Sequence, residues 1–582
     1  MGGDISLEMP SDLRRDFSTP NLHPDLLSQR GRGGITKLTV DIPSSYRPPP
    51  ENITTRYPSR WRTPEFYFYY VAFAAVVPFM IYIPIRLSYT THPNYLRYQH
   101  RLSPGWLFGQ KVDNSDHQYR TFRDNVPVLF ALLAVFLSLK QLYIRVIAPR
   151  LAIRSEANLH LVPFIISFGI LMLLGLHGSS APKVLAVFFL NYAIAKYTAA
   201  SKFSPLATWI FNVAVLFAAD KYAGFPYASL HPSLNYLDTL DGFYRWHVGF
   251  NITMLRLISF NMDYHWACRR IGQTDNGREL EYKERTRTFH SLEIYNILNY
   301  LAYVLYSPLY IGGPIMSFND FLWQLRRPLN IPLRTTLAYL FRFAVCILTM
   351  EFILHFMYVV AIKDTKAWQG DNAAELSMIG LWNLIIIWLK LLVPWRFFRL
   401  WALLDGIDPP ENMVRCVLNN YSAQGFWRAW HRSYNLWIVR YIYIPLGGTK
   451  NVVFTTILVF TFVALWHDLS FRLLAWGWLV SLFIIPEILA SYILPASKFD
   501  SRWWYRHACA VGAVFNMMMM MGANLVGFVL GTEGVSYMLG QIFSSWEGIR
   551  FIVFSCVCLF IGSQVMFEYR AEEIRKGVVR RC

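Results

Sequence analysis

Long apolar runs recur along almost the whole chain, and they limit its possible folds more than any other feature. A helix needs about 20 apolar residues to cross a bilayer, and shorter pieces enter only as tilted, broken or re-entrant segments. We therefore expect an all-α, polytopic membrane bundle with roughly 10–13 membrane segments, some of them re-entrant. The runs lie at about 66–86, 125–146, 159–177, 183–198, 206–223, 243–262, 292–312, 335–361, 378–402, 451–467, 471–494, 507–531 and 549–568.

Composition supports a membrane protein and excludes a nucleic-acid binder. Hydrophobic residues make up 54% of the chain and charged residues 16%, against roughly 25% charged in a soluble domain. The net charge of +18 comes with Lys and Arg placed mainly in the N-terminal tail and between apolar runs. That placement is typical of cytosolic loops beside anionic headgroups. The sequence contains no recognisable nucleic-acid-binding module. It also contains no CxxC pair, so the cysteines do not indicate a metal site.

Polarity divides the chain into three parts. Residues 1–64 are polar and rich in Pro, so we predict a disordered tail. Residues 65–570 form the predicted transmembrane catalytic domain, and 571–582 a short basic tail. Within the domain, 403–450 is too polar to span a bilayer and too aromatic for an ordinary loop. We expect this re-entrant or interfacial stretch to form the floor or mouth of an active-site cavity, because polar backbone at membrane depth must be enclosed by protein or face water.

His467 is the first candidate for chemistry. It ends a largely apolar run, NVVFTTILVFTFVALWH. A neutral imidazole accepts a proton near neutral pH, which suits a general base. Ionisable groups within membranes are functional by default. The alternative is a helix-end histidine near the interface, satisfied by a carbonyl or water, and the pattern alone does not choose.

His431 is the second candidate, in the stretch FWRAWHRSYNLW. At helical spacing, His431 and Asn435 share one face, while Trp427 and Trp430 lie on another. The alternative is an amphipathic interfacial helix with an aromatic side, which the pattern alone favours.

Two further features leave alternatives open. In YVLYSPLYIGGPIMSFNDF, prolines and glycines interrupt an apolar segment, and such a break either lines a site or is a simple kink. Glu351 and His355 are four residues apart, so they form a pair or, together with Lys390, a proton relay in a transporter.

Together these features resemble the membrane-bound O-acyltransferase (MBOAT) family. That family places a catalytic histidine in a long apolar stretch, and here the position matches His467. A second polar residue, Asn, Asp or His, stands some tens of residues upstream and matches His431. The resemblance covers residue 60 to the end and is greatest to the fungal Gup-type proteins of glycerol uptake and GPI-anchor remodelling. It is carried by YVLYSPLYIGGPIMSFNDF, RFFRLWALLDGIDPPENMVRC and QGFWRAWHRSYNLWIVRYIYIPLGG.

The resemblance implies a helical bundle around a central tunnel, with acyl-CoA as co-substrate and no covalently bound cofactor. The implied reaction moves a long or very-long acyl chain to the hydroxyl of a lysolipid, such as lyso-GPI or a GPI-anchored protein. The implied location is the endoplasmic-reticulum membrane, with the plasma membrane left open, and membrane lipids are the remaining partners. A glycerol/proton transporter and a non-catalytic scaffold of the same fold are the rival interpretations.

Several residues near the two histidines are candidates for substrate binding. Guanidinium groups bind phosphate bidentately, which suits CoA or anchor phosphates, although each Arg alone is better explained by membrane topology. The predicted substrate contacts are Arg396, Trp427, Arg428, Trp430, Arg432, Asn435 and Trp466.

Overall fold

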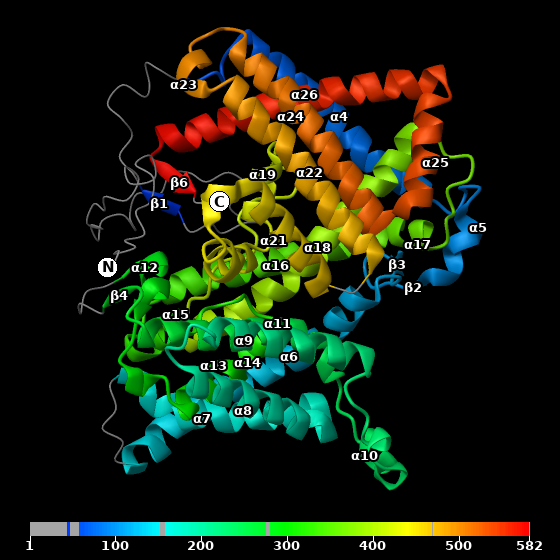
Figure 1. The fold of residues 1–582 in the computed structure, drawn as a ribbon. Coiled ribbons are helices and arrows are strands. Elements are labelled where there is room, and N and C mark those ends of the chain that lie inside the picture. Colours follow the sequence, from blue (N-terminus) through cyan, green and yellow to red (C-terminus); the bar gives the residue numbers. More distant parts are fainter. Residues whose placement is uncertain (1–43, 47–57, 152–156, 275–279, 468–469, 581–582) are drawn as a thin grey trace.

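A computed structural model describes residues 44–46, 58–151, 157–274, 280–467 and 470–580. Helices dominate it, as Figure 1 shows. They are α4 (Pro64–Leu87), α5 (Tyr95–Tyr98), α6 (His117–Leu142), α7 (Val162–His177), α8 (Ala181–Thr198), α9 (Ser204–Lys221), α10 (Asn235–Asp238), α11 (Trp246–Cys268), α12 (Tyr282–Arg287), α13 (Ile297–Leu305), α14 (Ser307–Ile311), α15 (Phe318–Arg326), α16 (Leu333–Phe356), α17 (Val359–Asp364), α18 (Ala373–Asp405), α19 (Ala423–Ala429), α20 (Arg432–Ile438), α21 (Val452–His467), α22 (Phe471–Ile493), α23 (Ala496–Phe499), α24 (Tyr505–Asn524), α25 (Gly531–Phe543) and α26 (Trp546–Arg575).

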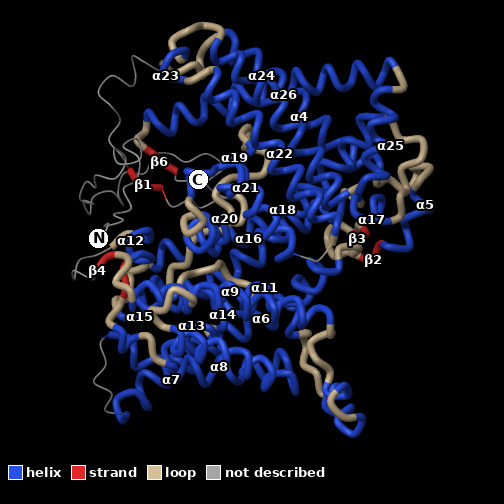
Figure 2. Tube along the Cα trace, in the orientation of Figure 1, coloured by secondary structure: helices blue, strands red, loops and turns tan. Residues whose placement is uncertain are grey.

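Strands are few and short in the described part of the chain (Figure 2). β2 (Leu102–Pro104) and β3 (Lys111–Asp113) form an antiparallel hairpin. β4 (Gln273–Thr274) and β5 (Thr288–Phe289) pair in parallel, and β1 (Ser44–Tyr46) pairs antiparallel with β6 (Val578–Arg580). The expected all-α bundle is therefore confirmed.

Eight helical stretches of the described chain are long and apolar enough to cross a membrane. The expected 10–13 segments also counted shorter pieces. One is α21, whose 16 residues fall short of a full crossing. Another is α8, which follows α7 after only a three-residue turn, so that the two form one continuous helical stretch.

The long helix α18 connects the two halves of the bundle. Its start is fixed by a capping box, in which Asn372 Oδ1 accepts from Glu375 N at 3.0 Å and Glu375 Oε2 from Asn372 N at 2.8 Å. Its end is fixed by Gly406 in the left-handed conformation (φ 92°). Between these caps α18 packs against α4, α6, α14, α16, α25 and α26.

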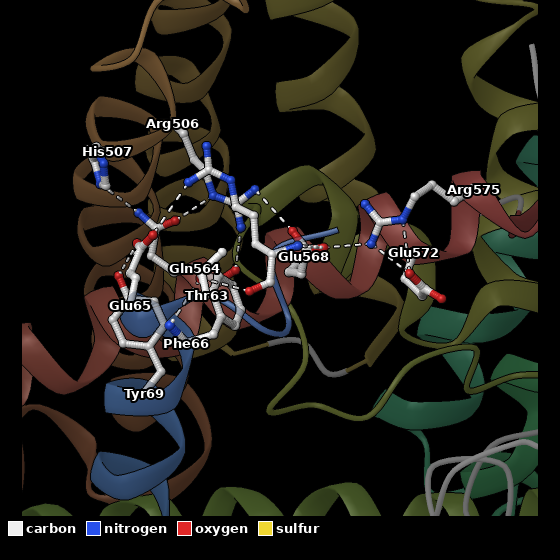
Figure 3. Close-up of polar contacts among 11 residues, drawn as sticks. Thr63, Glu65, Phe66, Tyr69, Arg506, His507, Gln564, Glu568, Glu572 and Arg575 are labelled. Atoms are coloured by element: carbon white, nitrogen blue, oxygen red, sulfur yellow. Dashed lines mark hydrogen bonds and ion pairs between the residues drawn. The ribbon is translucent and has the colours of Figure 1, made fainter. Parts of the chain in front are cut away.

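A network of polar side chains, here called the clasp, joins the first spanning helix to the last (Figure 3). Glu568 of α26 accepts from the backbone N of Arg60 at 3.0 Å and from Arg575 Nη2 at 2.6 Å. Arg506 of α24 donates to the side chain of Gln564 at 2.7 Å and to its backbone carbonyl at 2.8 Å. The clasp thus fixes the N-terminal ends of α4 and α24 to α26.

The predicted boundaries differ from the structure in detail. Most of the predicted tail 1–64 lies outside the described residues, but β1 within it pairs with β6. Helix α26 runs to Arg575, so the predicted boundary at 570/571 falls inside a helix. The basic C-terminal segment is therefore partly helix and partly strand.

Candidate active site

One large cavity, of about 1560 Å³, lies among α4, α18, α20, α21, α22, α24, α25 and α26. Both candidate histidines, His431 and His467, line it. Most of the other lining side chains are apolar, and four come from the methionine run of α24, at Met517, Met518, Met520 and Met521. A cavity of this size and character suits long hydrocarbon chains, with few polar groups to orient them.

His467 is the last residue of α21, and its side chain is exposed to the cavity. Its ring meets Trp466 edge-on at 4.7 Å and Trp476 at 6.4 Å between centroids. Trp466 is in turn fixed to α11, because its Nε1 donates to the carbonyl of Asn251 at 2.8 Å. The imidazole thus lies between aromatic neighbours and faces the cavity.

His431 stands between α19 and α20 in the left-handed conformation (φ 44°, ψ 51°). Its ring stacks on Trp395 of α18 at 4.4 Å and lies 5.2 Å from the ring of Tyr434. Trp466 lies 6.4 Å away, so this one indole contacts both histidines. The two histidines therefore share one aromatic corner of the cavity.

Asn412, which is fully buried, stabilises the left-handed turn at His431 by two hydrogen bonds to the backbone that follows it. The carbonyl of Asn412 accepts from Arg432 N at 2.8 Å, and its Oδ1 accepts from Ser433 N at 3.1 Å. Ser433 Oγ then accepts from Ile315 N at 2.9 Å. The three blocks that carry the family resemblance thus meet behind this histidine.

Glu487 of α22 anchors the polar stretch within the helical bundle. Its carboxylate accepts from the hydroxyl of Ser422, from Ala423 N at 2.8 Å and from Gln424 N at 3.3 Å. These donors lie at the start of α19. The carboxylate of Glu487 therefore accepts hydrogen bonds from N–H groups that have no acceptor within the helix, and its negative charge interacts favourably with the helix N-terminus. Sequence reasoning missed Glu487, although a carboxylate after Pro486 inside an apolar run was a usable signal.

Four of the predicted substrate residues line the cavity together with both histidines: Trp427, Arg428, Trp430 and Asn435. Trp466 contacts both histidine rings without belonging to the lining. Arg432 is half-buried and also lies outside the lining. The re-entrant stretch thus contributes several of the polar side chains of the cavity wall.

Arg396 does not fit the prediction of a substrate contact. Its side chain is fully buried, its Nη1 lies 3.2 Å from the sulfur of Cys346, and it is absent from the cavity wall. Arg399, three residues further along α18, forms ion pairs with Asp408 at 2.6 Å and with Glu411 at 3.5 Å. The reason is helical phase, since this part of α18 faces α16 and the 408–411 segment.

The features assigned to a transporter have structural partners. Glu351 accepts from Trp106 Nε1 and Tyr119 OH, each at 3.1 Å, and His355 Nε2 accepts from Trp106 N at 3.3 Å. This pair therefore anchors the β2–β3 hairpin. Lys390 lines the cavity and is paired with Asp116 at 2.7 Å.

The break in the 303–321 block is a packed kink. Gly312 is positioned where an added Cβ would meet the ring of Phe398 at 2.9 Å, so a side chain at this position would have to displace that ring. The block lies outside the cavity wall. Its contribution to the site is the N–H of Ile315 behind His431.

Comparison of the sequence with known protein families defines the class. The sequence model of the MBOAT, membrane-bound O-acyltransferase family, matches residues 199–532, more than half of the chain. The chain belongs to this family of membrane-bound acyltransferases.

Particular relatives extend the likeness over nearly the whole length. The membrane-bound O-acyltransferase GUP1 of Saccharomyces cerevisiae is 46% identical over 567 residues, covering 94% of this chain and 98% of the relative. The gup1 protein of Schizosaccharomyces pombe is 42% identical over 533 residues, covering 89% and 90%. The mouse protein-cysteine N-palmitoyltransferase HHAT is 30% identical over 186 residues, covering 30% and 37%.

Proposed function

We propose that this acyltransferase moves a long or very-long acyl chain from acyl-CoA to the free hydroxyl of a lysolipid, with lyso-GPI as the acceptor. The observation that carries the proposal is the pair His431 and His467 on one wall of a large, mainly apolar cavity. Such a cavity suits the two hydrocarbon chains of donor and acceptor. The relative named as a palmitoyltransferase supports a long acyl chain.

In the proposed reaction His467 acts as general base. Its neutral imidazole takes the proton of the acceptor hydroxyl as the hydroxyl oxygen attacks the thioester carbonyl. The tetrahedral intermediate collapses, the C–S bond breaks, and the thiolate of CoA takes up the proton from His467. The new bond is an ester, and an acyl-enzyme is not needed because the thioester is already activated.

His431 is proposed to orient the acceptor or to stabilise the developing oxyanion. Its left-handed backbone and its stack on Trp395 fix the ring direction before substrate arrives. Arg428, on the polar wall of the cavity, is the proposed contact for a CoA or anchor phosphate. Exclusion of water from an apolar cavity protects the thioester from hydrolysis.

The lyso-GPI acceptor and the endoplasmic-reticulum location rest on the resemblance to Gup-type proteins. A glycerol transporter is not favoured by the site, because Glu351 and His355 have structural partners in the described fold.

The test is acyl transfer by purified protein in lipid nanodiscs, with labelled long-chain acyl-CoA and a lyso-GPI extract. His467→Ala should lower the rate by about 100- to 10,000-fold, the usual contribution of a positioned base. His117→Ala, at an exposed histidine outside the cavity, is the matched control and should retain wild-type rates. Equal transfer by wild type and a folded His467→Ala variant would contradict the mechanism, and glycerol flux without any transfer would replace the proposal by transport.

A further inference from the structure

The described residues that line the large cavity include two cationic side chains and no acidic one. The cations are Lys390 of α18 and Arg428 of α19. Most of the remaining wall is apolar, and such surroundings screen a charge much less than bulk water does. The wall therefore favours a ligand that carries negative charge, and the two cations are the places where that charge can bind.

Lys390 lies in the middle of a helix that is long and apolar enough to cross a membrane. Its neighbours in the lining of α18, Ile387 and Leu391, are apolar. Five residues further along α18, or about 8 Å along the helix axis, Trp395 stacks on the ring of His431. A charged side chain at this depth that faces a cavity is expected to serve function. The flexible stem of a lysine brings its ammonium group within reach of a ligand bound beside the histidines.

Asp116 fixes the ammonium group of Lys390 at the edge of the cavity. Lys390 Nζ donates to Asp116 Oδ2 at 2.7 Å, and Gln118, two residues after Asp116, lines the cavity itself. Asp116 Oδ1 accepts from Tyr119 N at 2.9 Å, so this carboxylate is also the N-cap of α6, and the helix N-terminus offsets part of its charge. In the described part of the chain Asp116 is the partner of Lys390 and uses one of its three N–H donors, which leaves donors for a ligand.

The two cations of the wall lie on different sides of His431. Asp116, the partner of Lys390, follows β3 after two residues, and Figure 1 shows β3 on the side of the bundle away from the chain termini. Arg428 belongs to α19, which lies nearer the termini in the same view. His431 follows Arg428 by three residues and meets α18 at Trp395. One cation is therefore placed to serve the donor and the other to serve the acceptor.

We propose that Lys390 determines the specificity of the acceptor site by binding a phosphate group of the acceptor lipid. The acceptor is then a lysophospholipid, in which only a few covalent bonds separate the phosphate from the hydroxyl that takes the acyl chain. With the phosphate on Lys390, this hydroxyl points along α18 towards Trp395 and His431. Arg428 is left for a phosphate of CoA. The role of the lipid as acyl acceptor rests on the proposed function, whereas the binding of its phosphate at Lys390 does not.

The pair with Asp116 allows the charge of Lys390 to be tested separately from its contribution to stability. Lys390→Met alone would leave a carboxylate without its cation, which destabilises a fold, so the test variant is Asp116→Asn/Lys390→Met, which removes both charges. Asp116→Asn alone keeps the cation, and Lys390→Arg keeps the positive charge. Lys140→Met is the matched control, because Lys140 of α6 is also half-buried and pairs in the same way with Asp405, outside the large cavity.

The experiment measures lipid binding to the purified protein in nanodiscs, with empty nanodiscs as background. The probes are radiolabelled lysophosphatidylinositol and a monoacylglycerol with the same acyl chain. We expect Asp116→Asn/Lys390→Met to bind the lysophospholipid about 10- to 100-fold more weakly, the usual contribution of a hydrogen bond to a charged group, and to bind the monoacylglycerol as wild type does. Wild type, Asp116→Asn, Lys390→Arg and Lys140→Met should all prefer the lysophospholipid. Thermal unfolding of each variant confirms that it is folded.

Three outcomes would overturn the proposal. Equal affinity of wild type for the two lipids, or an unchanged preference in the double variant, would show that Lys390 does not read the phosphate. An equal loss of affinity for both lipids would assign Lys390 a purely structural role. A loss of affinity for long-chain acyl-CoA, with lysophospholipid binding intact, would assign Lys390 to the donor. Because binding needs no chemical step, the expected binding pattern without acyl transfer would contradict the proposed function alone.

Discussion

Helices α11 and α24 show how differently the two halves of the bundle are packed. In α11, 15 of 23 residues are buried, including the charged Arg256 and Asp263. In α24, only four of 20 are buried. The few buried residues of α26 are Gly548, Ser563, Gln564, Glu568 and Glu573, none of them large and apolar. The region around α11 is thus a packed scaffold, whereas α24 and α26, which line the cavity, form a thin wall.

The largest effects are expected in the scaffold, and the first of them is the removal of a buried charge. Asp263 is fully buried and accepts from Arg440 Nη2 at 2.7 Å, Tyr441 OH at 3.0 Å and Asn319 N at 3.1 Å. Asp263→Ala should lower the free energy of unfolding by about 3–5 kcal/mol, because it leaves a largely buried guanidinium uncompensated. Unfolding in detergent measures this, with Asp220→Ala at an exposed position as control. Similar values for the two variants would refute the scaffold assignment.

A smaller loss of stability, but a clear loss of activity, is expected where the scaffold meets the site. Asn412→Leu removes the acceptor for Ser433 N and should cost about 1–3 kcal/mol in unfolding free energy. If His431 acts as proposed, its displacement should lower kcat by about 100-fold. Asn412→Asp keeps the Oδ1 acceptor and should restore most of the rate. A Leu variant with full activity would show that His431 does not depend on this contact.

The contact between Asn94 and Asp371, which precede α5 and α18, should respond to pH. Burial, followed by the nearby charge of Glu375, raises the pKa of Asp371 to about 7, while Asn94 Nδ2 donates to it at 3.1 Å. The pKa of Asp371 in the folded state lies above its unfolded value. The stability that protonated Asp371 contributes is therefore fully present below about pH 4 and is lost as pH rises through about 7. The melting temperature of wild type should therefore fall over this window relative to Asp371→Asn. Parallel pH profiles for both proteins would contradict the assignment.

The smallest effect is expected on the wall. Phe554→Ala removes a ring that is 56% exposed, so unfolding free energy should change by no more than about 0.5 kcal/mol. Phe260→Ala is the scaffold counterpart, because its ring is fully buried 4.5 Å from Tyr300 and 4.9 Å from Phe318. It should cost about 3–5 kcal/mol. Equal costs at the two positions would remove the distinction between scaffold and wall.

Features that depend on local pattern were predictable from sequence. The spanning helices follow from apolar length, and the position of 403–450 at the cavity follows from its polarity within a membrane domain. Contacts between distant segments were not predictable, such as Asn412 behind His431 or Glu487 at the start of α19. The direction of Arg396, away from the cavity wall, was not predictable either, because charge alone does not say which way a helical residue faces. The roles of His431 and His467 in chemistry remain predictions that await the acyl-transfer assay.

The left-handed backbone at His431 also restricts which amino acids can occupy the position. A φ of 44° is unfavourable for most side chains, and among non-glycine residues it is Asn, Asp and His that adopt such angles most readily. The resemblance to the family allows the same three residue types at this position. The backbone conformation alone therefore favours nearly the same set of residue types, independently of any catalytic requirement. Substitution of His431 with Gln or Glu would destabilise this left-handed conformation even though the new side chain is polar.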